Sequence, residues 1–247
     1  MASSPNVPHN PDSGREGDEF LSPSIGPYSL DSYWARFSIL KAIQEALPEF
    51  KGTVLDVGCG RMPYRSILLD RPSRATRYVG LDLESMLYNN KPDLTWDGVS
   101  IPLPDAEVEC ALATEVLEHC PDPMLVLREI NRVLKPGGFL LLTVPFLWPL
   151  HDVPHDEFRY TPFSMERFLK ETGFSEIAVQ TSGGWDASLA QMLGLWIRRR
   201  PMNEFLRRIL QRAVLPLYRL LLARDQAPKR SQSCMITGLS ARARKPV

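Results

Sequence analysis

Short hydrophobic runs recur along the chain and alternate with longer segments whose apolar residues repeat at helical spacing. Each run is only a few residues long, which is typical of strands that are buried on both faces of a parallel sheet. The runs predict strands at 54–57, 78–83, 94–96, 108–114, 139–144, 177–181 and 235–243. No internal repeat interrupts this alternation.

Helices are predicted between these strands, at 28–47, 64–70, 123–134 and 161–172. Proline and glycine mark several of their ends: Pro48 follows the first helix, Pro162 lies in the first turn of the last one, and Gly173 stops it. A helix is also one interpretation of the weakly patterned stretch 84–90. The alternation predicts an α/β fold, a doubly wound and mostly parallel seven-stranded sheet with helices on both faces.

Composition places this sheet in one domain with extensions. The 247 residues are 44% hydrophobic, which is enough for a full core. Residues 1–26 are rich in Ser, Pro, Asn, Asp and Gly and lack the apolar core of a signal peptide. We expect them to be a disordered tail, and we expect residues 27–247 to form a single domain.

Charge and cysteine usage bear on the partners of the protein and on its cellular compartment. The formal net charge is +0, so the overall charge gives no argument for a nucleic-acid partner, and we expect none. The four cysteines are scattered and form no CxxC pair. We therefore expect a reduced, cytoplasmic protein, and no run has the length and apolarity of a membrane span.

Two strand ends carry the most specific chemistry in the chain. The strand at 54–57 runs into Gly58-Cys59-Gly60, and glycines at a strand end let the backbone turn sharply and let a ligand approach closely. Asp82 lies at the end of the next strand, where a carboxylate can accept hydrogen bonds from both hydroxyls of a ribose. Together they predict an adenosine-binding site at the carboxyl ends of the sheet.

Four motifs follow one another in a fixed order: Leu55-Asp56-Val57-Gly58-Cys59-Gly60, Gly80-Leu81-Asp82, Glu115-Val116-Leu117-Glu118-His119, and Leu134-Lys135-Pro136-Gly137-Gly138. In this order and spacing the chain resembles the class I S-adenosylmethionine-dependent methyltransferases, which have a Rossmann-like fold. The closest resemblance is to the branch that methylates small molecules, lipids and quinones. It covers residues 52–181 and the final strand. It departs at Arg61-Met62-Pro63-Tyr64, where the family often has a further glycine.

The resemblance implies S-adenosylmethionine as the cofactor. Gly58 and Gly60 would line its amino-acid part, and Asp56 would orient the loop or receive the cofactor's ammonium group, directly or through water. Simpler roles stay open for two of them, because Asp56 could cap a helix and Gly58 could be a plain turn residue.

Three acidic residues complete the implied cofactor site. Asp82 would hold the ribose, Asp97 after the third strand would face the adenine amine, and Glu115 after the fourth strand would open the floor of the pocket. Glu115 could instead cap a helix.

A nicotinamide dinucleotide is the alternative cofactor, since its binding loop also needs glycines and an acid about 20 residues on. Here Arg61-Met62-Pro63 stands where the third glycine is expected. Pro63 removes an N–H group that a pyrophosphate would need at a helix N-terminus. S-adenosylmethionine has no phosphate, so the loop favours the methyl donor over an oxidoreductase cofactor.

The long segment 145–162 leaves the fifth strand at the same sheet edge, where open α/β sheets bind ligands. We expect it to bind the acceptor, through Trp148, Arg159 and Tyr160. Arg159 could hold a carboxylate or phosphate, or could pair with Asp156 or Glu157 within the loop.

Histidines supply the candidate catalytic groups, namely His151, His155 and His119. An imidazole can take the proton of a hydroxyl while the methyl group is transferred. The alternative is that these rings only bond the loops to themselves or cap a helix. The spacing of His151 and His155 also suggests zinc, but Pro154 argues against the helix that such a pair would need, so we predict no metal.

Residues 185–233 form an insertion before the last strand, which we expect to be helical around 205–224 and kinked or divided at Pro216. Leu206, Ile209, Leu210 and Ala213 fall on one helical face, with Arg207, Arg208 and Arg212 elsewhere. A basic amphipathic helix suggests peripheral contact with a membrane through 203–224, or a polyanionic lipid substrate. A helical lid or the face of a homodimer is the other interpretation.

These features predict an enzyme that transfers a methyl group from S-adenosylmethionine to a small-molecule, sugar or lipid-linked acceptor, with oxygen as the preferred acceptor atom. The alternative from another class is a noncatalytic module that binds S-adenosylmethionine and regulates a partner. The density of polar side chains in 145–162 favours the enzyme.

Overall fold

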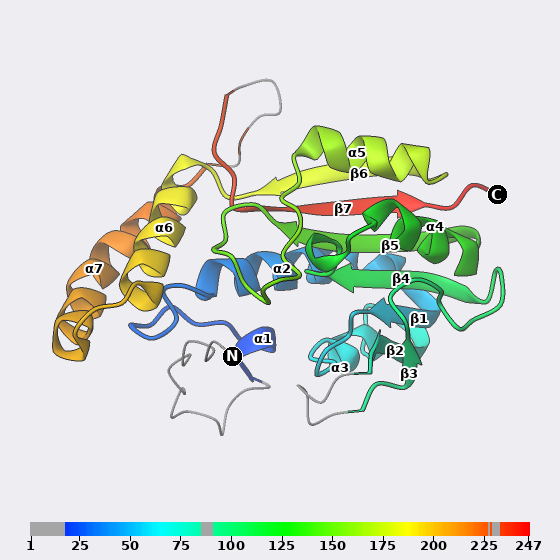
Figure 1. Ribbon diagram of the computed structural model, residues 1–247, viewed down its shortest axis with the longest axis horizontal. Helices are drawn as coiled ribbons and strands as arrows, with labels where there is room; N and C mark the ends of the chain where they lie inside the picture. Colours follow the sequence, from blue (N-terminus) through cyan, green and yellow to red (C-terminus); the bar gives the residue numbers. More distant parts are fainter. Residues whose placement is uncertain (1–17, 85–90, 227, 229–232) are drawn as a thin grey trace.

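The computed structural model describes residues 18–84, 91–226, 228 and 233–247 (Figure 1). Their strands form one seven-stranded sheet in the order β3-β2-β1-β4-β5-β7-β6. Neighbours are parallel from β3 to β5, whereas β7 is antiparallel to both β5 and β6. The strands are β1 Lys51–Val57, β2 Arg74–Leu83, β3 Leu94–Trp96, β4 Val108–Thr114, β5 Leu134–Pro145, β6 Ser175–Ser182 and β7 Gly238–Arg244. The predicted α/β class and its mostly parallel sheet are confirmed.

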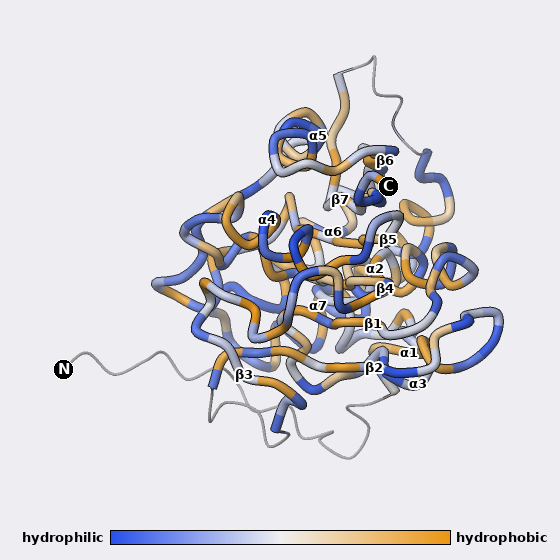
Figure 2. The backbone as a smooth tube through the Cα atoms, turned by 90° about the vertical axis from the view of Figure 1, so that its right-hand side faces the viewer, coloured by the Kyte–Doolittle hydropathy of each residue, from blue (hydrophilic) through white to orange (hydrophobic). Residues whose placement is uncertain are grey.

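Helices cover both faces of this sheet. α2 and α3 contribute Ile43 and Leu68 to the core on one face, and α4 and α5 contribute Leu127 and Leu169 to the core on the other. The hydrophobic segments of the central strands lie between these layers in Figure 2. The helices are α1 Asp18–Leu21, α2 Tyr33–Ala46, α3 Arg65–Leu69, α4 Pro123–Val133, α5 Pro162–Glu171, α6 Trp185–Arg199 and α7 Glu204–Arg224, with 3-10 turns at Leu47–Glu49 and Leu117–His119.

The amino-terminal tail is shorter than predicted. Residues 18–26, which the sequence places in a disordered tail, include α1 and pack against the domain. Glu19 pairs with Arg36 of α2, and the Phe20 ring meets the Tyr64 ring edge-on with centroids 6.2 Å apart. One ion pair and one aromatic contact therefore hold a segment whose composition alone looks disordered. Residues 1–17 and the weakly patterned stretch 85–90 lie outside the described residues.

Strand β5 begins five residues earlier than predicted. Leu134-Lys135-Pro136-Gly137-Gly138 belongs to the strand rather than to a helix stop before it. The carboxyl-terminal segment pairs with this stretch, because the Gly137 N–H donates to the Lys245 carbonyl at 2.9 Å and the Lys245 N–H donates to the Gly138 carbonyl at 3.0 Å. The last residues of the chain thus extend the sheet where the sequence shows only breakers.

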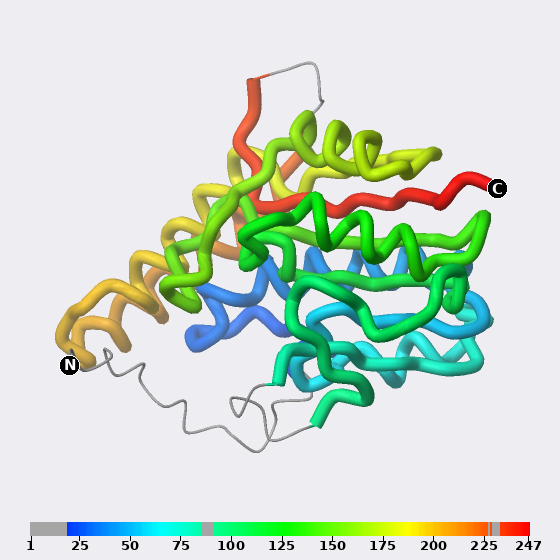
Figure 3. Tube along the Cα trace, turned by 45° about the vertical axis from the view of Figure 1, so that its right-hand side comes forward, coloured from blue at the N-terminus to red at the C-terminus, as the bar shows by residue number. Residues whose placement is uncertain are grey.

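The insertion forms two packed helices, α6 and α7, which we call the helical hairpin. Figures 1 and 3 show it projecting beyond one end of the sheet. α7 is continuous through Pro216, so the predicted division there is wrong. α6 packs closely on the turn before α2: a Cβ added at Gly194 would lie 2.0 Å from the Leu30 carbonyl oxygen.

Candidate active site

The loop after β1 is built on two glycines with left-handed backbone. The N–H groups of Gly58 and Cys59 both donate to the Leu81 carbonyl of β2, at 2.8 and 3.1 Å. Gly58 has φ +67°, and a Cβ there would lie 2.4 Å from a methyl carbon of Val116. Gly60 has φ +50°, and a Cβ there would meet nothing within 4 Å. The loop therefore lies tightly against its neighbours at Gly58 and faces open space at Gly60.

Asp82 lies beside this loop, as the sequence predicts. Its carboxylate accepts hydrogen bonds from the Gly60 N–H at 2.7 Å and from the Leu83 N–H at 2.7 Å. A carboxylate has about four lone-pair positions, so Asp82 can accept further hydrogen bonds from a ligand. The end of β2 therefore brings a negatively charged acceptor to the open side of the glycine loop.

Asp97 follows β3, one strand farther along the same edge. Its Oδ1 accepts hydrogen bonds from the N–H groups of Ser100 and Val99, both at 2.8 Å, and these bonds lower the pKa of the carboxyl. The side chain is exposed and ionised at neutral pH. Asp82 and Asp97 thus lie at the ends of adjacent strands, where one extended ligand can reach both.

Asp56 lies beneath the glycine loop rather than in the open space above it. Its side chain is 1% exposed, and the Tyr78 hydroxyl donates a hydrogen bond to it. Burial raises the pKa of this carboxyl to about 7, although the Tyr78 hydrogen bond acts in the opposite direction. This position suits a residue that supports the loop better than one that touches a cofactor.

The raised pKa of Asp56 predicts a pH-dependent stability. The folded protein holds a proton on Asp56 that the unfolded chain releases from about pH 4 upward, so the free energy of unfolding should fall as the pH rises toward 7. Between about pH 5 and about pH 7, the free energy of unfolding should fall less in Asp56→Asn than in wild type, by about 1–2 kcal/mol. Urea unfolding of both proteins at the two pH values measures it. Asp70→Asn, at an exposed position, is the matched control, and parallel pH profiles for wild type and Asp56→Asn would contradict the assignment.

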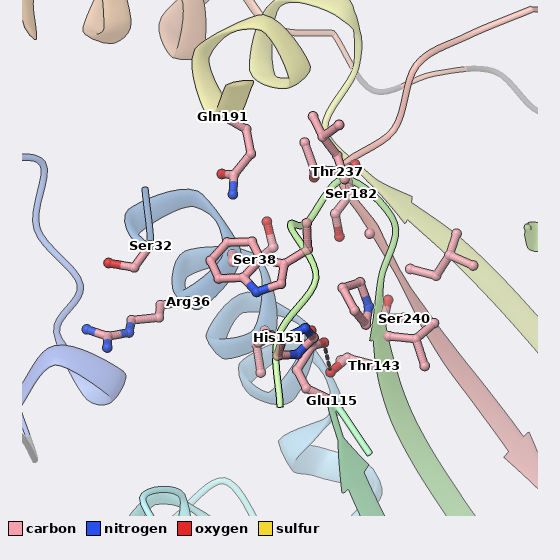
Figure 4. Close-up of a pocket in the computed structure, with 18 of the residues that line it drawn as sticks. Ser32, Arg36, Ser38, Glu115, Thr143, His151, Ser182, Gln191, Thr237 and Ser240 are labelled. Atoms are coloured by element: carbon pink, nitrogen blue, oxygen red, sulfur yellow. Dashed lines mark hydrogen bonds between the residues drawn. The ribbon is translucent and has the colours of Figure 1, made fainter. Parts of the chain in front are cut away.

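A cavity of about 330 Å³ lies over the ends of β4, β5 and β7, next to the glycine loop (Figure 4). α2, the loop after β5 and α6 complete its walls. Its polar lining combines six hydroxyl side chains with one amide and six charged or imidazole side chains, Asp152 and Arg199 among them. The polar lining residues include Ser32, Ser38, Thr143, Ser182, Thr237, Ser240, Gln191, Arg36, Glu115, His119 and His151.

Glu115 lies in this lining, where the sequence predicts the floor of the pocket. The Thr143 hydroxyl donates a 2.8 Å hydrogen bond to its carboxylate, and burial raises the pKa of the Glu115 carboxyl to about 7 (Figure 4). Its φ of 54° is in the left-handed region, a strain that proteins keep mainly at functional sites. Val116, two residues after β4, lies against Gly58 of the glycine loop. The segment after β4 therefore connects the two halves of the site, the cofactor half around the glycine loop and the cavity.

His151 lies in the cavity wall, and Asp156 contacts its imidazole ring. Its Nδ1 is 3.3 Å from a carboxylate oxygen of Asp156, which Arg159 holds with two hydrogen bonds of 2.6 and 2.8 Å. The Arg159 guanidinium keeps the pKa of Asp156 well below its usual range, so Asp156 is an ionised acceptor. In the neutral tautomer that donates from Nδ1 to Asp156, Nε2 of His151 has the lone pair that can accept a proton.

His119 is the second imidazole in the cavity wall. Its ring meets the His151 ring edge-on with centroids 4.7 Å apart, and its Nδ1 is 2.9 Å from the His155 carbonyl oxygen. His155 contributes that carbonyl but does not line the cavity. The structure therefore brings together two of the three predicted histidines.

Of the three residues predicted to bind the acceptor, one lines the cavity and two do not. Trp148 lines the cavity, whereas Tyr160 is 2% exposed and donates its hydroxyl hydrogen to the Leu117 carbonyl at 2.7 Å. Arg159 pairs with Asp156, the within-loop alternative that the sequence left open. Both side chains shape the loop, and contact of either with an acceptor stays a prediction.

Sequence reasoning missed Glu118, which is fully buried with neither carboxylate oxygen bonded to another described residue. Burial and the nearby Glu115 raise its pKa well above the usual range. Ligand atoms of Glu118, His119 and His151 lie within 4.8 Å of one another, and two imidazoles with a carboxylate are a donor set that divalent transition metals bind. The sequence weighed a metal only for His151 with His155, whereas the structure brings His151 beside His119 and Glu118.

Residues 55–142 match the family model of a methyltransferase domain. The match covers 88 of the 247 residues, and over this stretch the chain is similar to methyltransferase domains. An uncharacterised methyltransferase of Mycobacterium sp. (strain JLS) is 28% identical over 169 residues, which cover 60% of this chain and 66% of the relative. A trans-aconitate 2-methyltransferase of Azoarcus sp. (strain BH72) is 30% identical over 155 residues, covering 58% and 59%. The chain spans less than two thirds of the length of the first curated relatives that it matches.

A solved structure supports the fold. Phosphoethanolamine N-methyltransferase 2 of Haemonchus contortus, in complex with S-adenosyl-L-methionine, aligns with a TM-score of 0.56 at 17% identity, over 96% of this chain and 57% of that one. The cofactor of the family is S-adenosylmethionine, and the glycine loop fits it. The space above Gly60 can take its amino-acid part, and the free lone pairs of Asp82 can take its ribose hydroxyls. Met62 and Pro63 continue the loop without a third glycine, so the nicotinamide alternative is set aside.

Proposed function

We propose that the protein methylates a hydroxyl oxygen of a small-molecule, sugar or lipid-linked acceptor that binds in the cavity. The observation that carries this proposal is the array of His151, Asp156 and Arg159 in the cavity wall. An imidazole that is oriented by an ionised carboxylate through Nδ1 is a general base at Nε2. A hydroxyl must lose its proton when its oxygen is methylated, so it is an acceptor group that such a base serves.

Each half of the site has a separate task in this function. When bound, S-adenosylmethionine supplies an electrophilic methyl group. Gly60, Asp82 and Asp97 hold the cofactor, while Glu115 and Thr143 lie where the two halves meet. Nε2 of His151 takes the proton that the acceptor hydroxyl loses, and Asp156 stabilises the resulting imidazolium. Alignment of the acceptor by the cavity walls supplies the rest of the rate acceleration.

The lining of the cavity supports a hydroxylated acceptor. Ser38, Ser182 and Ser240 offer hydroxyls, and the Gln191 side-chain oxygen is buried without a partner among the described residues. Trp148 adds an aromatic surface, which is a common partner for the apolar face of a sugar or ring. The relatives named above act on different acceptors, so the family match supports the reaction class and leaves the acceptor to the cavity.

Transfer of a labelled methyl group tests this proposal. The protein is incubated with S-adenosylmethionine labelled at the methyl carbon and with cell extract separated into polar small molecules, lipids and macromolecules. We expect a labelled product in the first or second fraction, with the label on oxygen by mass spectrometry and NMR, and no product with His151→Ala. Tight cofactor binding without transfer to any fraction would instead support the noncatalytic regulatory module.

A further inference from the structure

The outer face of α7 is apolar and lies in solvent. Five of its large hydrophobic side chains are between 46% and 73% exposed: Phe205, Leu206, Ile209, Leu217 and Leu220. At about 100° per residue these positions fall within a sector of about 120° around the helix axis, so they form one stripe, which we call the outer stripe. The domain covers the opposite side of α7, where Arg207, Gln211 and Tyr218 are buried.

Contacts on the buried side fix this orientation. Arg207 is 7% exposed, and its guanidinium donates to the carbonyls of Ile197 and Arg198, both at 2.7 Å, at the end of α6. Tyr218 is fully buried in a cluster with Leu30 and Ala190. A rotation of α7 that hid the outer stripe would break these contacts, so the domain itself does not cover the stripe.

Basic side chains border the outer stripe. Residues 185–225 contain eight arginines and three acidic residues, in a chain whose net charge is +0. On α7, Arg208, Arg212 and Arg219 follow one edge of the stripe at helical spacing. Arg208 and Arg212 are exposed and form no hydrogen bond or ion pair with another described residue. Their charges are therefore free to meet an external anion.

α6 carries a second apolar row with interfacial character. Trp185, Leu189, Met192 and Trp196 lie on one side of it and are between 44% and 64% exposed. The Arg200 guanidinium lies 4.6 Å from the centre of the Trp196 ring. Tryptophan with arginine beside it is typical of segments that lie at a membrane–water interface.

A second copy of the chain is the competing partner for the outer stripe. A two-fold interface brings the same patch of each subunit together. Such an interface would place two rows of arginines close to each other, and Glu204, the acidic residue within α7, already pairs with Arg207. An anionic lipid surface offers the complementary charge to the same row, together with acyl chains for the stripe.

We propose that the helical hairpin docks the protein on an anionic lipid surface. The outer stripe lies at the boundary of headgroups and acyl chains, and Arg208 and Arg212 contact lipid phosphates. No helix among the described residues is long and apolar enough to cross a membrane. The proposal goes beyond methyl transfer and does not depend on it, because it concerns a surface outside the cofactor half of the site.

Flotation of the full chain with vesicles tests this docking. We expect the protein to float with vesicles of phosphatidylcholine and phosphatidylglycerol at low salt, and not with phosphatidylcholine alone or at high salt. Arg208→Gln with Arg212→Gln should lower the partition coefficient about thirtyfold, since each arginine near an anionic surface contributes on the order of 1 kcal/mol. Phe205→Ser with Ile209→Ser should abolish flotation.

Matched controls separate docking from general charge and from misfolding. Arg77→Gln with Arg128→Gln removes the same charge from exposed positions on β2 and α4 and should float like wild type. Circular dichroism and cofactor binding verify that each variant is folded. No flotation of the wild type on anionic vesicles at low salt would overturn the proposal. A dimer in sedimentation that Phe205→Ser with Ile209→Ser converts to a monomer would also overturn it and assign the stripe to a second copy.

Discussion

Replacing His151 with alanine is expected to slow methyl transfer by about 10²–10⁴-fold, the usual contribution of a positioned general base. The Kd for S-adenosylmethionine should stay near the wild-type value, because His151 lies in the acceptor cavity rather than at the glycine loop. Single-turnover assays with saturating acceptor, together with calorimetry, measure the two quantities. Equal turnover in wild type and His151→Ala would leave alignment alone as the source of catalysis.

His155 offers the matched control for this experiment. It lies four residues away in the same loop but does not line the cavity, so His155→Ala should keep nearly full turnover. Asp156→Asn should act through His151 and shift the pH profile of turnover.

Treatment with a chelator distinguishes a general base from a metal site in the cluster of Glu118, His119 and His151. A base is insensitive to chelation, whereas a loss of turnover that Mn²⁺ or Zn²⁺ restores would assign the cluster to a metal.

Replacing Asp82 with alanine is expected to weaken S-adenosylmethionine binding by about 1–3 kcal/mol, or roughly fivefold to more than a hundredfold in Kd. The change removes a charged acceptor for the ribose and leaves the Gly60 N–H without its present partner. Calorimetry with S-adenosylmethionine and with S-adenosylhomocysteine measures the effect without any turnover.

Asp70→Ala is the control for the Asp82 variant. Asp70 is exposed, follows α3 and precedes the start of β2, at the opposite end of this strand from the partly buried Asp82. It should bind the cofactor like wild type. Unchanged affinity in Asp82→Ala, or tight binding of NAD to the wild type, would contradict the assigned cofactor half.

The sequence predicts the sheet best where strands are buried on both faces. β4 has the predicted bounds, because it lies inside the sheet and is buried along most of its length. β3 also has the predicted bounds, although it is a short edge strand that is only partly buried. The start of β2 is missed because Arg74 and Arg77 interrupt the apolar pattern at a strand end that lies in solvent. The start of β5 is missed because the carboxyl-terminal segment pairs with it from more than a hundred residues away.

The sequence predicts which residues belong to the candidate site better than it predicts which of them contact one another. The motifs place Gly60, Asp82 and Glu115 at one sheet edge, since parallel strands end there. They do not show that His151 meets His119, although each follows one of two strands that the fold makes neighbours, β5 and β4. The partner of Arg159 depends on the path of the loop, which spacing alone cannot choose among Asp156, Glu157 and an acceptor.

Most of the residues that line the cavity come from parts of the chain outside the family match. Among the described residues that line it, Glu115 and His119 fall within residues 55–142, whereas the rest come from α1, α2, the end of β5 and its loop, β6, β7 and α6. If the cavity binds the acceptor as proposed, cofactor binding and acceptor choice are encoded in separate stretches of sequence. Such a division lets a lineage exchange the acceptor by changing flanking segments while the methyl-donor half stays intact, so relatives of this chain should be grouped by α2, the loop after β5 and the hairpin rather than by their shared core.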